Sequence, residues 1–140
     1  MPLRLSVLVL LVAAALLAGC GDDSDDAEST TTADYDITGS WAGELHQEGL
    51  DPFRVTADIQ SLDDSAQNTV HYTGIDCSGT WSYEGRSGAA FRFREVIDSG
   101  VGGKCKGVGT VSLTPFADDG VDYQFDGGGV QSVGVLKRTG

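Results

Sequence analysis

The feature that most constrains the fold is an alternation of apolar and polar side chains that begins at Ile37. For example, Val55, Ala57 and Ile59 alternate with polar residues. Successive side chains of a β-strand point to opposite faces of a sheet, so this period indicates half-buried antiparallel strands. No window longer than ten residues in this region carries a helical stripe. We predict strands near residues 38–47, 53–61, 68–75, 77–84, 89–97, 104–114, 120–126 and 130–138.

Short turn signals rich in Gly, Asp, Ser and Pro separate these segments. Evenly spaced strands joined by short turns predict an up-and-down meander that closes into a small barrel or curls into a sandwich. Closure would remove exposed strand edges. The 20 glycines fit this arrangement, because tight turns and strongly bent strands need them. The expected fold class is all-β, with a single small domain over residues 37–140.

The amino-terminal region has the parts of a secretory signal: Arg4, the apolar run Leu5–Ala18, and small residues before Cys20. This run is shorter than the roughly 20 apolar residues that span a bilayer. Leu17-Ala18-Gly19-Cys20 resembles the lipobox of bacterial lipoproteins. The resemblance implies cleavage of a signal peptide over residues 1–19 and a diacylglycerol on the Cys20 thiol, which anchors the chain outside the cytoplasm. The alternative is an ordinary signal peptide, with Cys20 incidental.

An acidic segment follows the lipobox, and we expect residues 20–36 to form the lipidated Cys and an extended, mobile spacer. Calcium binding is the alternative reading of its Asp cluster, but the turn glycine and distal Glu of an EF-hand loop are missing. The formal net charge is −12, and residues 37–140 carry 14 acids and 8 bases, a net charge of −6. This balance argues against nucleic-acid binding.

Two cysteines remain after Cys20, and an even number in an exported chain predicts a disulfide between Cys77 and Cys105. On the chain-entropy model, closing a loop of about 28 residues stabilises the fold by roughly 3–4 kcal/mol. A zinc site is the alternative, but it needs four ligands, and neither cysteine has a Cys or His nearby in sequence. His46 and His71 are also far apart in sequence. We therefore expect no metal and no cofactor.

Two resemblances concern the domain itself. Gly39-Ser40-Trp41 is similar to the Gly-x-Trp that opens calycin barrels such as lipocalins, which implies a barrel with a ligand pocket; the alternative is a purely structural Trp41. A longer pattern resembles a small two-cysteine β-domain of uncharacterised actinobacterial lipoproteins and receptor-type kinases, for which no catalytic residue is defined. Its residues are Trp41-x-Gly43, Tyr72, Cys77-Ser78-Gly79, Phe93-x-Glu95-x-Ile97, Cys105, Gly109-x-Val111-x-Leu113, Tyr123 and Gly134-x-Leu136-x-Arg138.

Glu95 is the most informative single side chain. It shares the strand face of Phe91 and Phe93, which would point its carboxylate inward. A buried carboxylate must be paired or protonated, and Arg138 is a candidate partner. The alternatives are a bulge that exposes Glu95 and a ligand-binding acid.

Other motifs carry less chemistry. Gly100–Lys104 is glycine-rich, but Cys105 follows where a phosphate loop needs Ser or Thr and a helix, so we expect a hairpin loop. Arg92, Arg94, Lys104 and Lys106 could form one basic patch, or be ordinary solvated charge. No Gly-x-Ser-x-Gly or comparable arrangement indicates a nucleophile.

These observations predict an extracytoplasmic lipoprotein, held on the cell membrane, that acts as a binding or interaction module and not as an enzyme. Its partner would be a cell-wall component, a protein or a small apolar ligand. The alternatives are a structural envelope protein without a ligand and a hydrolase that uses a carboxylate pair. The interior of the domain distinguishes between these partners. A filled core favours recognition at the surface, and a cavity of several hundred Å³ favours a small apolar ligand.

Overall fold

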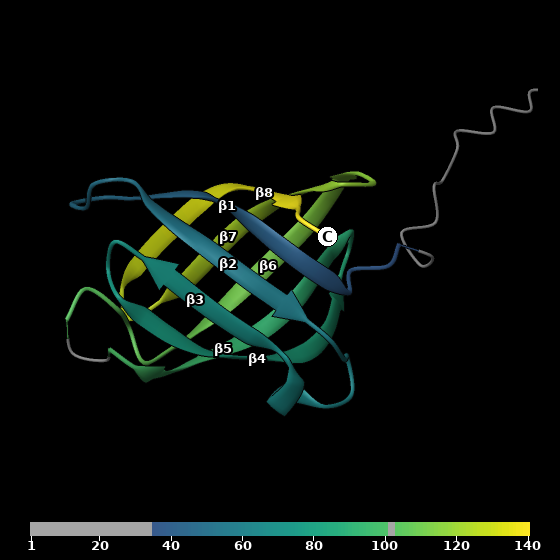
Figure 1. Ribbon diagram of the computed structural model, residues 1–140, viewed down its shortest axis with the longest axis horizontal. Coiled ribbons are helices and arrows are strands. Elements are labelled where there is room, and N and C mark those ends of the chain that lie inside the picture. Colours follow the sequence, from purple (N-terminus) through teal and green to yellow (C-terminus); the bar gives the residue numbers. More distant parts are fainter. Residues whose placement is uncertain (1–34, 101–102) are drawn as a thin grey trace, which may run out of the picture. The chain divides into compact units, whose positions relative to one another are not determined.

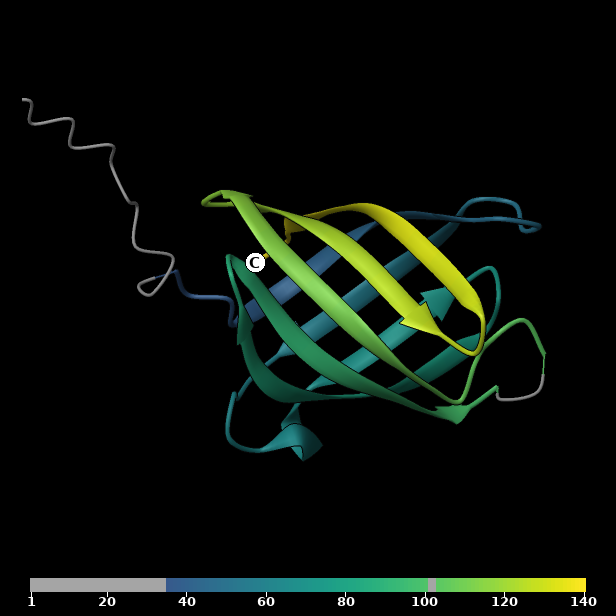
Figure 2. The ribbon, with the colours of Figure 1, turned by 180° about the vertical axis from the view of Figure 1, so that it is seen from behind.

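Eight antiparallel strands form a closed barrel in the computed structural model, which describes residues 35–100 and 103–140 (Figure 1, Figure 2). Each strand pairs with its neighbours in sequence, and β8 pairs with β1. The predicted up-and-down meander is therefore confirmed, in its barrel form. The strands are β1 (Gly39–Gln47), β2 (Phe53–Ile59), β3 (Thr69–Thr73), β4 (Cys77–Ser87), β5 (Ala90–Ser99), β6 (Val108–Ala117), β7 (Gly120–Gly127) and β8 (Val130–Arg138).

The predicted strand boundaries agree closely with the observed ones, with one larger difference. β6 begins at Val108, because residues 104–107 belong to the connection that follows β5. Between β2 and β3 lies a single 3-10 turn, η2 (Ser65–Gln67). Asn68 after it is fully buried, and its side chain bonds the backbone of both the loop and β4, which fixes this connection.

The inward side chains of all eight strands fill the barrel. Trp41 and Trp81 are the largest fully buried side chains. Glycines allow the strands to bend around this core: a Cβ on Gly79 would lie 2.1 Å from the carbonyl oxygen of Val96. The buried apolar residues are Ile37, Trp41, Leu45, Phe53, Val55, Ala57, Ile59, Val70, Tyr72, Cys77, Trp81, Phe91, Phe93, Ile97, Cys105, Val111, Leu113, Val121, Tyr123, Phe125 and Leu136.

One end of the barrel is plugged by Trp41 and Arg138, which are cross-strand partners on β1 and β8. The guanidinium carbon lies 4.3 Å from the centre of the indole ring. Arg138 Nη1 donates to the carbonyl of Thr38 at 2.5 Å, and Nη2 to that of Asp36 at 2.7 Å. The indole N–H of Trp41 donates to the carbonyl of Ile37 at 3.0 Å. This end of the barrel therefore carries a polar clasp over an aromatic plug, and we call it the closed end.

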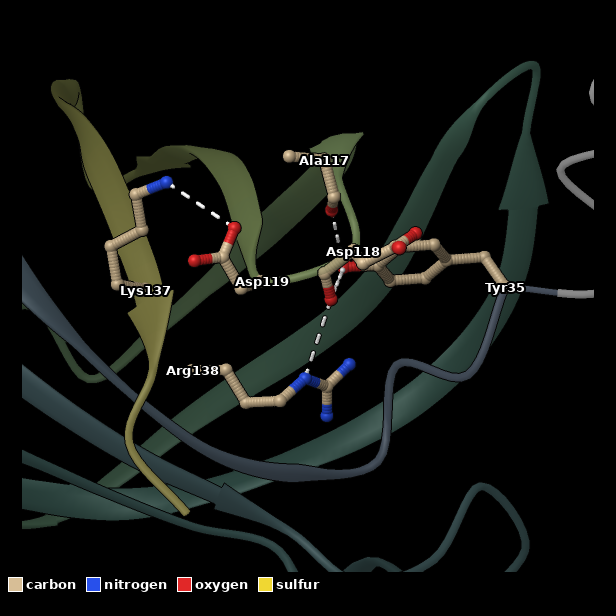
Figure 3. A network of polar contacts seen from close by, with 6 residues as sticks. All are labelled: Tyr35, Ala117, Asp118, Asp119, Lys137 and Arg138. Atoms are coloured by element: carbon tan, nitrogen blue, oxygen red, sulfur yellow. Dashed lines mark hydrogen bonds and ion pairs between the residues drawn. The ribbon is translucent and has the colours of Figure 1, made fainter.

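Tyr35 joins the clasp from the segment that precedes β1 (Figure 3). Its hydroxyl lies 3.0 Å from the carbonyl oxygen of Ala117 and 3.2 Å from that of Asp118. Arg138 Nε donates to the same Asp118 carbonyl at 3.4 Å. The contacts tie the turn between β6 and β7 to the entry of the chain, although Tyr35 and Asp36 fall in the segment predicted as a mobile spacer.

Cys77 and Cys105 form a disulfide, as predicted, with their Cα atoms 6.4 Å apart. The bond joins the start of β4 to the connection between β5 and β6. Gly100 approaches the same region, because a Cβ there would lie 2.4 Å from the carbonyl oxygen of Asp76. Two connections at the end of the barrel opposite the clasp are thus fastened together.

Candidate functional site: the open end of the barrel

The end opposite the clasp, which we call the mouth, is bordered by the connections that follow β1, β3, β5 and β7 (Figure 1). A cavity of about 30 Å³ lies inside it, between Phe53, Phe125, Ile97 and Cys105. That volume holds one or two water molecules. The barrel interior is therefore almost completely filled, and drug-sized ligands, which occupy pockets of about 300–1,000 Å³, have no room in this conformation.

Glu95 forms part of the wall of this cavity and is 3 % exposed. It lies on β5 directly opposite Trp81 on β4. Its Oε2 accepts a hydrogen bond from the Trp81 indole N–H at 2.8 Å and a second one from the Tyr72 hydroxyl. The predicted inward orientation of Glu95 is confirmed. The predicted pairing with Arg138 is wrong, because Arg138 belongs to the clasp at the closed end.

A second tyrosine extends this cluster. The hydroxyl oxygens of Tyr72 and Tyr123 are 3.0 Å apart. Since Tyr72 gives its proton to Glu95, Tyr123 donates to Tyr72. The rings also pack, with the Trp81 centroid 6.3 Å from that of Tyr123. The Tyr72 hydroxyl and the Trp81 indole thus donate directly to one carboxylate oxygen, and Tyr123 supports them by donating to Tyr72.

Burial dominates the electrostatics of the cluster. Desolvation raises the pKa of Glu95 above its usual value, and the hydrogen bonds from Tyr72 and Trp81 oppose that rise. Desolvation also raises the pKa of Tyr72 and of Tyr123 well above the usual value, and the adjacent Glu95 charge adds to it. Both tyrosines therefore stay protonated and act as donors.

No cation neutralises this carboxylate within residues 35–100 and 103–140, where the ion pairs are His46 with Glu44 and Lys137 with Asp119. Both hydrogen bonds to Glu95 reach Oε2, so Oε1 has no partner in the described part of the chain. Glu95 is also the one buried acid there. A buried carboxylate pair of the kind a hydrolase uses is accordingly absent from these residues.

Two lysines stand at the rim of the mouth. Lys104 and Lys106 flank Cys105 and line the cavity from the connection between β5 and β6. Across the rim, the hydroxyl of buried Ser132 donates to the amide oxygen of Gln47 at 2.6 Å. The charged residues that line the cavity are therefore Lys104 and Lys106 at its entrance and Glu95 inside. The acids Glu48, Asp51 and Asp76 lie on the other connections of the mouth and do not line the cavity.

The predicted basic patch is divided by the fold. Arg92 and Arg94 are exposed on the outer face of β5, whereas Lys104 and Lys106 line the mouth. The glycine-rich stretch before Lys104 connects two strands, as expected of a hairpin loop.

Other residues singled out from the sequence lie elsewhere. His46 and His71 are exposed and distant in the chain. No group of three or more His, Cys, Asp and Glu suited to a metal occurs in the described residues. None of the helices among those residues is long and apolar enough to cross a membrane. The lipobox with Cys20, and nearly all of the acidic spacer, lie outside them.

Fold and mouth together define a small closed antiparallel β-barrel with one disulfide and a polar interior cluster. No protein-family model and no curated protein matches the sequence. A solved structure with a similar fold is a designed protein from the de novo design of a fluorescence-activating β-barrel. The TM-score is 0.55 at 19 % identity, over 77 % of this chain and 97 % of that chain. At this identity the likeness concerns the fold alone, and it agrees with a calycin-like barrel.

Trp81 is the member of the cluster that our sequence reasoning missed. A signal was present, because Trp81 and Glu95 fall on inward positions of neighbouring predicted strands. Tyr72 and Tyr123 belong to the two-cysteine β-domain pattern, but the sequence assigned no chemical role to either hydroxyl. Their convergence depends on the closure of the barrel, which brings β3 and β7 to face each other across the interior.

Proposed function

We propose that the chain is a lipoprotein of the cell envelope, anchored through Cys20, whose barrel binds a small polar group at its mouth. The observation that carries this proposal is the buried carboxylate of Glu95, which lines a small cavity and has one oxygen without a partner in the described residues.

The energetics of Glu95 support a role in binding. Removing a carboxylate from water costs several kcal/mol, and a well-packed apolar side chain at the same place is often more stable. A buried titratable group with a raised pKa in a concave site is a typical mark of function. Burial of Glu95 lowers the free energy of unfolding. The contacts of Arg138 with Trp41 and Thr38 at the closed end raise it and so offset part of this loss.

The size of the cavity limits what can bind. About 30 Å³ admits a group of the size of a water molecule, so the rest of the ligand would remain in the open mouth beside the lysines. This arrangement favours a polar end group of a small molecule, or of a cell-wall component, over an apolar ligand enclosed in the barrel. Attachment through Cys20 would hold the barrel at the cell envelope. Mass spectrometry of the native protein tests this attachment, because it would detect the lipid on Cys20.

The indole N–H of Trp81 provides a direct test, because it is bonded to Glu95 while that of Trp41 is bonded at the other end. The chain has two tryptophans, so the indole region of a ¹H–¹⁵N spectrum contains two signals. We expect a set of small amines, acids, zwitterions and neutral polar compounds to include a class that shifts the Trp81 signal and leaves Trp41 unchanged.

Glu95→Gln should abolish that shift, and Glu84→Gln should preserve it, because Glu84 is exposed on β4. The proposal is refuted if no compound class moves the Trp81 signal, or if Glu95→Gln responds as the wild type does. The same screen then favours a structural envelope protein without a ligand.

A further inference from the structure

We infer that the ligand at the mouth is a small zwitterion that places a primary ammonium group against Glu95 and its anionic group between Lys104 and Lys106. This inference rests on the proposed function, because it names the chemistry of the ligand for the same site.

Among the described residues, the cluster around Glu95 has no uncommitted hydrogen-bond donor and no positive charge. The Tyr72 hydroxyl and the Trp81 indole already donate to Oε2 of Glu95. Oε1 remains as an acceptor, and the Tyr123 hydroxyl has already committed its hydrogen to Tyr72. Ligand groups that only accept hydrogen bonds would therefore find no free donor in the cluster, whereas an ammonium would supply both the missing hydrogen and the missing charge.

Size and surroundings select among cations. A cavity of about 30 Å³ has the capacity for a primary ammonium, which is close to water in size, but not for a trimethylammonium. Phe53 and Phe125 form aromatic walls of the same cavity. Aromatic rings attract cations by their quadrupoles, and this attraction increases when the cation is desolvated.

The rim selects against a simple amine. Lys104 and Lys106 line the entrance, and neither forms an ion pair within residues 35–100 and 103–140. At the entrance, a molecule with positive charge alone would meet these two ammonium groups, and Glu48, Asp51 and Asp76 on the other connections do not line the cavity to offset them there. One that also carries a carboxylate would meet both lysines with its anionic end while the ammonium reaches Glu95. The charge sequence from rim to interior, positive and then negative, is the complement of a zwitterion.

Calorimetric titration with a series of ω-amino acids tests this inference on the disulfide-bonded chain. The series runs from glycine through β-alanine and 4-aminobutyrate to 6-aminohexanoate, so that the spacing between the two charged groups is varied. Propylamine serves as the control without a carboxylate, and trimethylglycine as the control without a primary ammonium. We expect at least one amino acid to bind more tightly than propylamine, and trimethylglycine not to bind.

Variants separate the two ends of the site. Glu95→Gln should weaken the amino acid by about tenfold or more, the amount expected when a charge-assisted hydrogen bond is lost. The Lys104→Gln and Lys106→Gln double variant should weaken it by about threefold, as for a solvent-exposed pair, and should not weaken propylamine. Since both lysines lie at the surface of a connection, this double variant tests the inference even if Glu95→Gln folds poorly.

The results separate the two levels of the argument. Equal binding of trimethylglycine and glycine, or an unchanged amino-acid affinity in the double lysine variant, would overturn the zwitterion. If neutral or anionic compounds shift the Trp81 signal and no amine does, the zwitterion is wrong and the binding mouth stands. If no compound moves that signal, both proposals fail.

Discussion

Replacement of Arg138 by Ala should remove the clasp at the closed end of the barrel. Three hydrogen bonds from the guanidinium, of 2.5 Å to Thr38, 2.7 Å to Asp36 and 3.4 Å to Asp118, would be lost. Hydrogen bonds to charged groups contribute about 1.5–3 kcal/mol each, and a cation over an aromatic face about 0.5–2 kcal/mol. Because Arg138 is only half-buried and water can replace part of these contacts, we expect a net loss of about 2–4 kcal/mol.

Denaturant unfolding of the disulfide-bonded domain, followed by tryptophan fluorescence, measures this loss. A change of 1 kcal/mol shifts the melting temperature of a domain of about 100 residues by roughly 4–8 °C, so a loss of about 2–4 kcal/mol should lower the melting temperature by about 8–32 °C. Arg138→Lys keeps the charge but loses the planar fork, and it should recover less than half of the free energy.

Lys137→Ala is the matched control on the same strand. The ammonium of Lys137 is exposed and lies 3.5 Å from Asp119, and exposed ion pairs contribute at most about 1 kcal/mol. A loss below about 1 kcal/mol for Arg138→Ala, or full stability in Arg138→Lys, would show that the fork and its stacking on Trp41 do not hold this end.

Three further predictions concern other parts of the barrel. Because the pKa of Glu95 is raised in the folded state, the native protein binds the proton more readily than the unfolded chain. The free energy of unfolding should therefore fall as pH rises from 4.5 through the raised pKa of Glu95. Glu95→Gln should remove this fall when unfolding is measured as a function of pH. Gly79→Ala should cost about 1–3 kcal/mol in the same assay because its Cβ meets backbone, whereas at Gly103 the nearest contact is 3.7 Å away and Ala should be nearly neutral. The Cys77→Ser and Cys105→Ser double variant should unfold about 3–4 kcal/mol more easily, and equal stability with the oxidised protein would contradict the role of the disulfide.

The sequence predicted the strands well because each inward position is determined locally. Period two identifies a face for residues such as Val55 and Phe93, and the glycine-rich turns mark where each strand ends. The difference at β6 has a specific cause. The residues from Lys104 to Lys106 continue the alternation of polar and apolar side chains, which predicted a strand from residue 104. The disulfide instead holds Cys105 against Cys77 at the start of β4, and β6 begins at Val108.

The site could be predicted only in part, because alternation gives the face of a residue and not its level along the barrel. The opposite charges of Glu95 and Arg138, together with their inward positions, predict an ion pair between them. The register places Arg138 beside Trp41 at one end of β1, whereas Glu95 lines the cavity near the mouth. Contacts across the barrel, such as Tyr72 with Tyr123, follow from closure and have no counterpart in local sequence.

The two ends of the barrel divide stability and binding between them. At the closed end, carbonyl oxygens and the Trp41 ring surround the charge of Arg138, and these contacts raise the free energy of unfolding. At the mouth, the charge of Glu95 is buried without a cation from the described residues, which costs stability that a ligand would return on binding. Binding and stability are therefore linked: a ligand that satisfies Glu95 should raise the melting temperature of the wild type, and at the same concentration should raise that of Glu95→Gln much less.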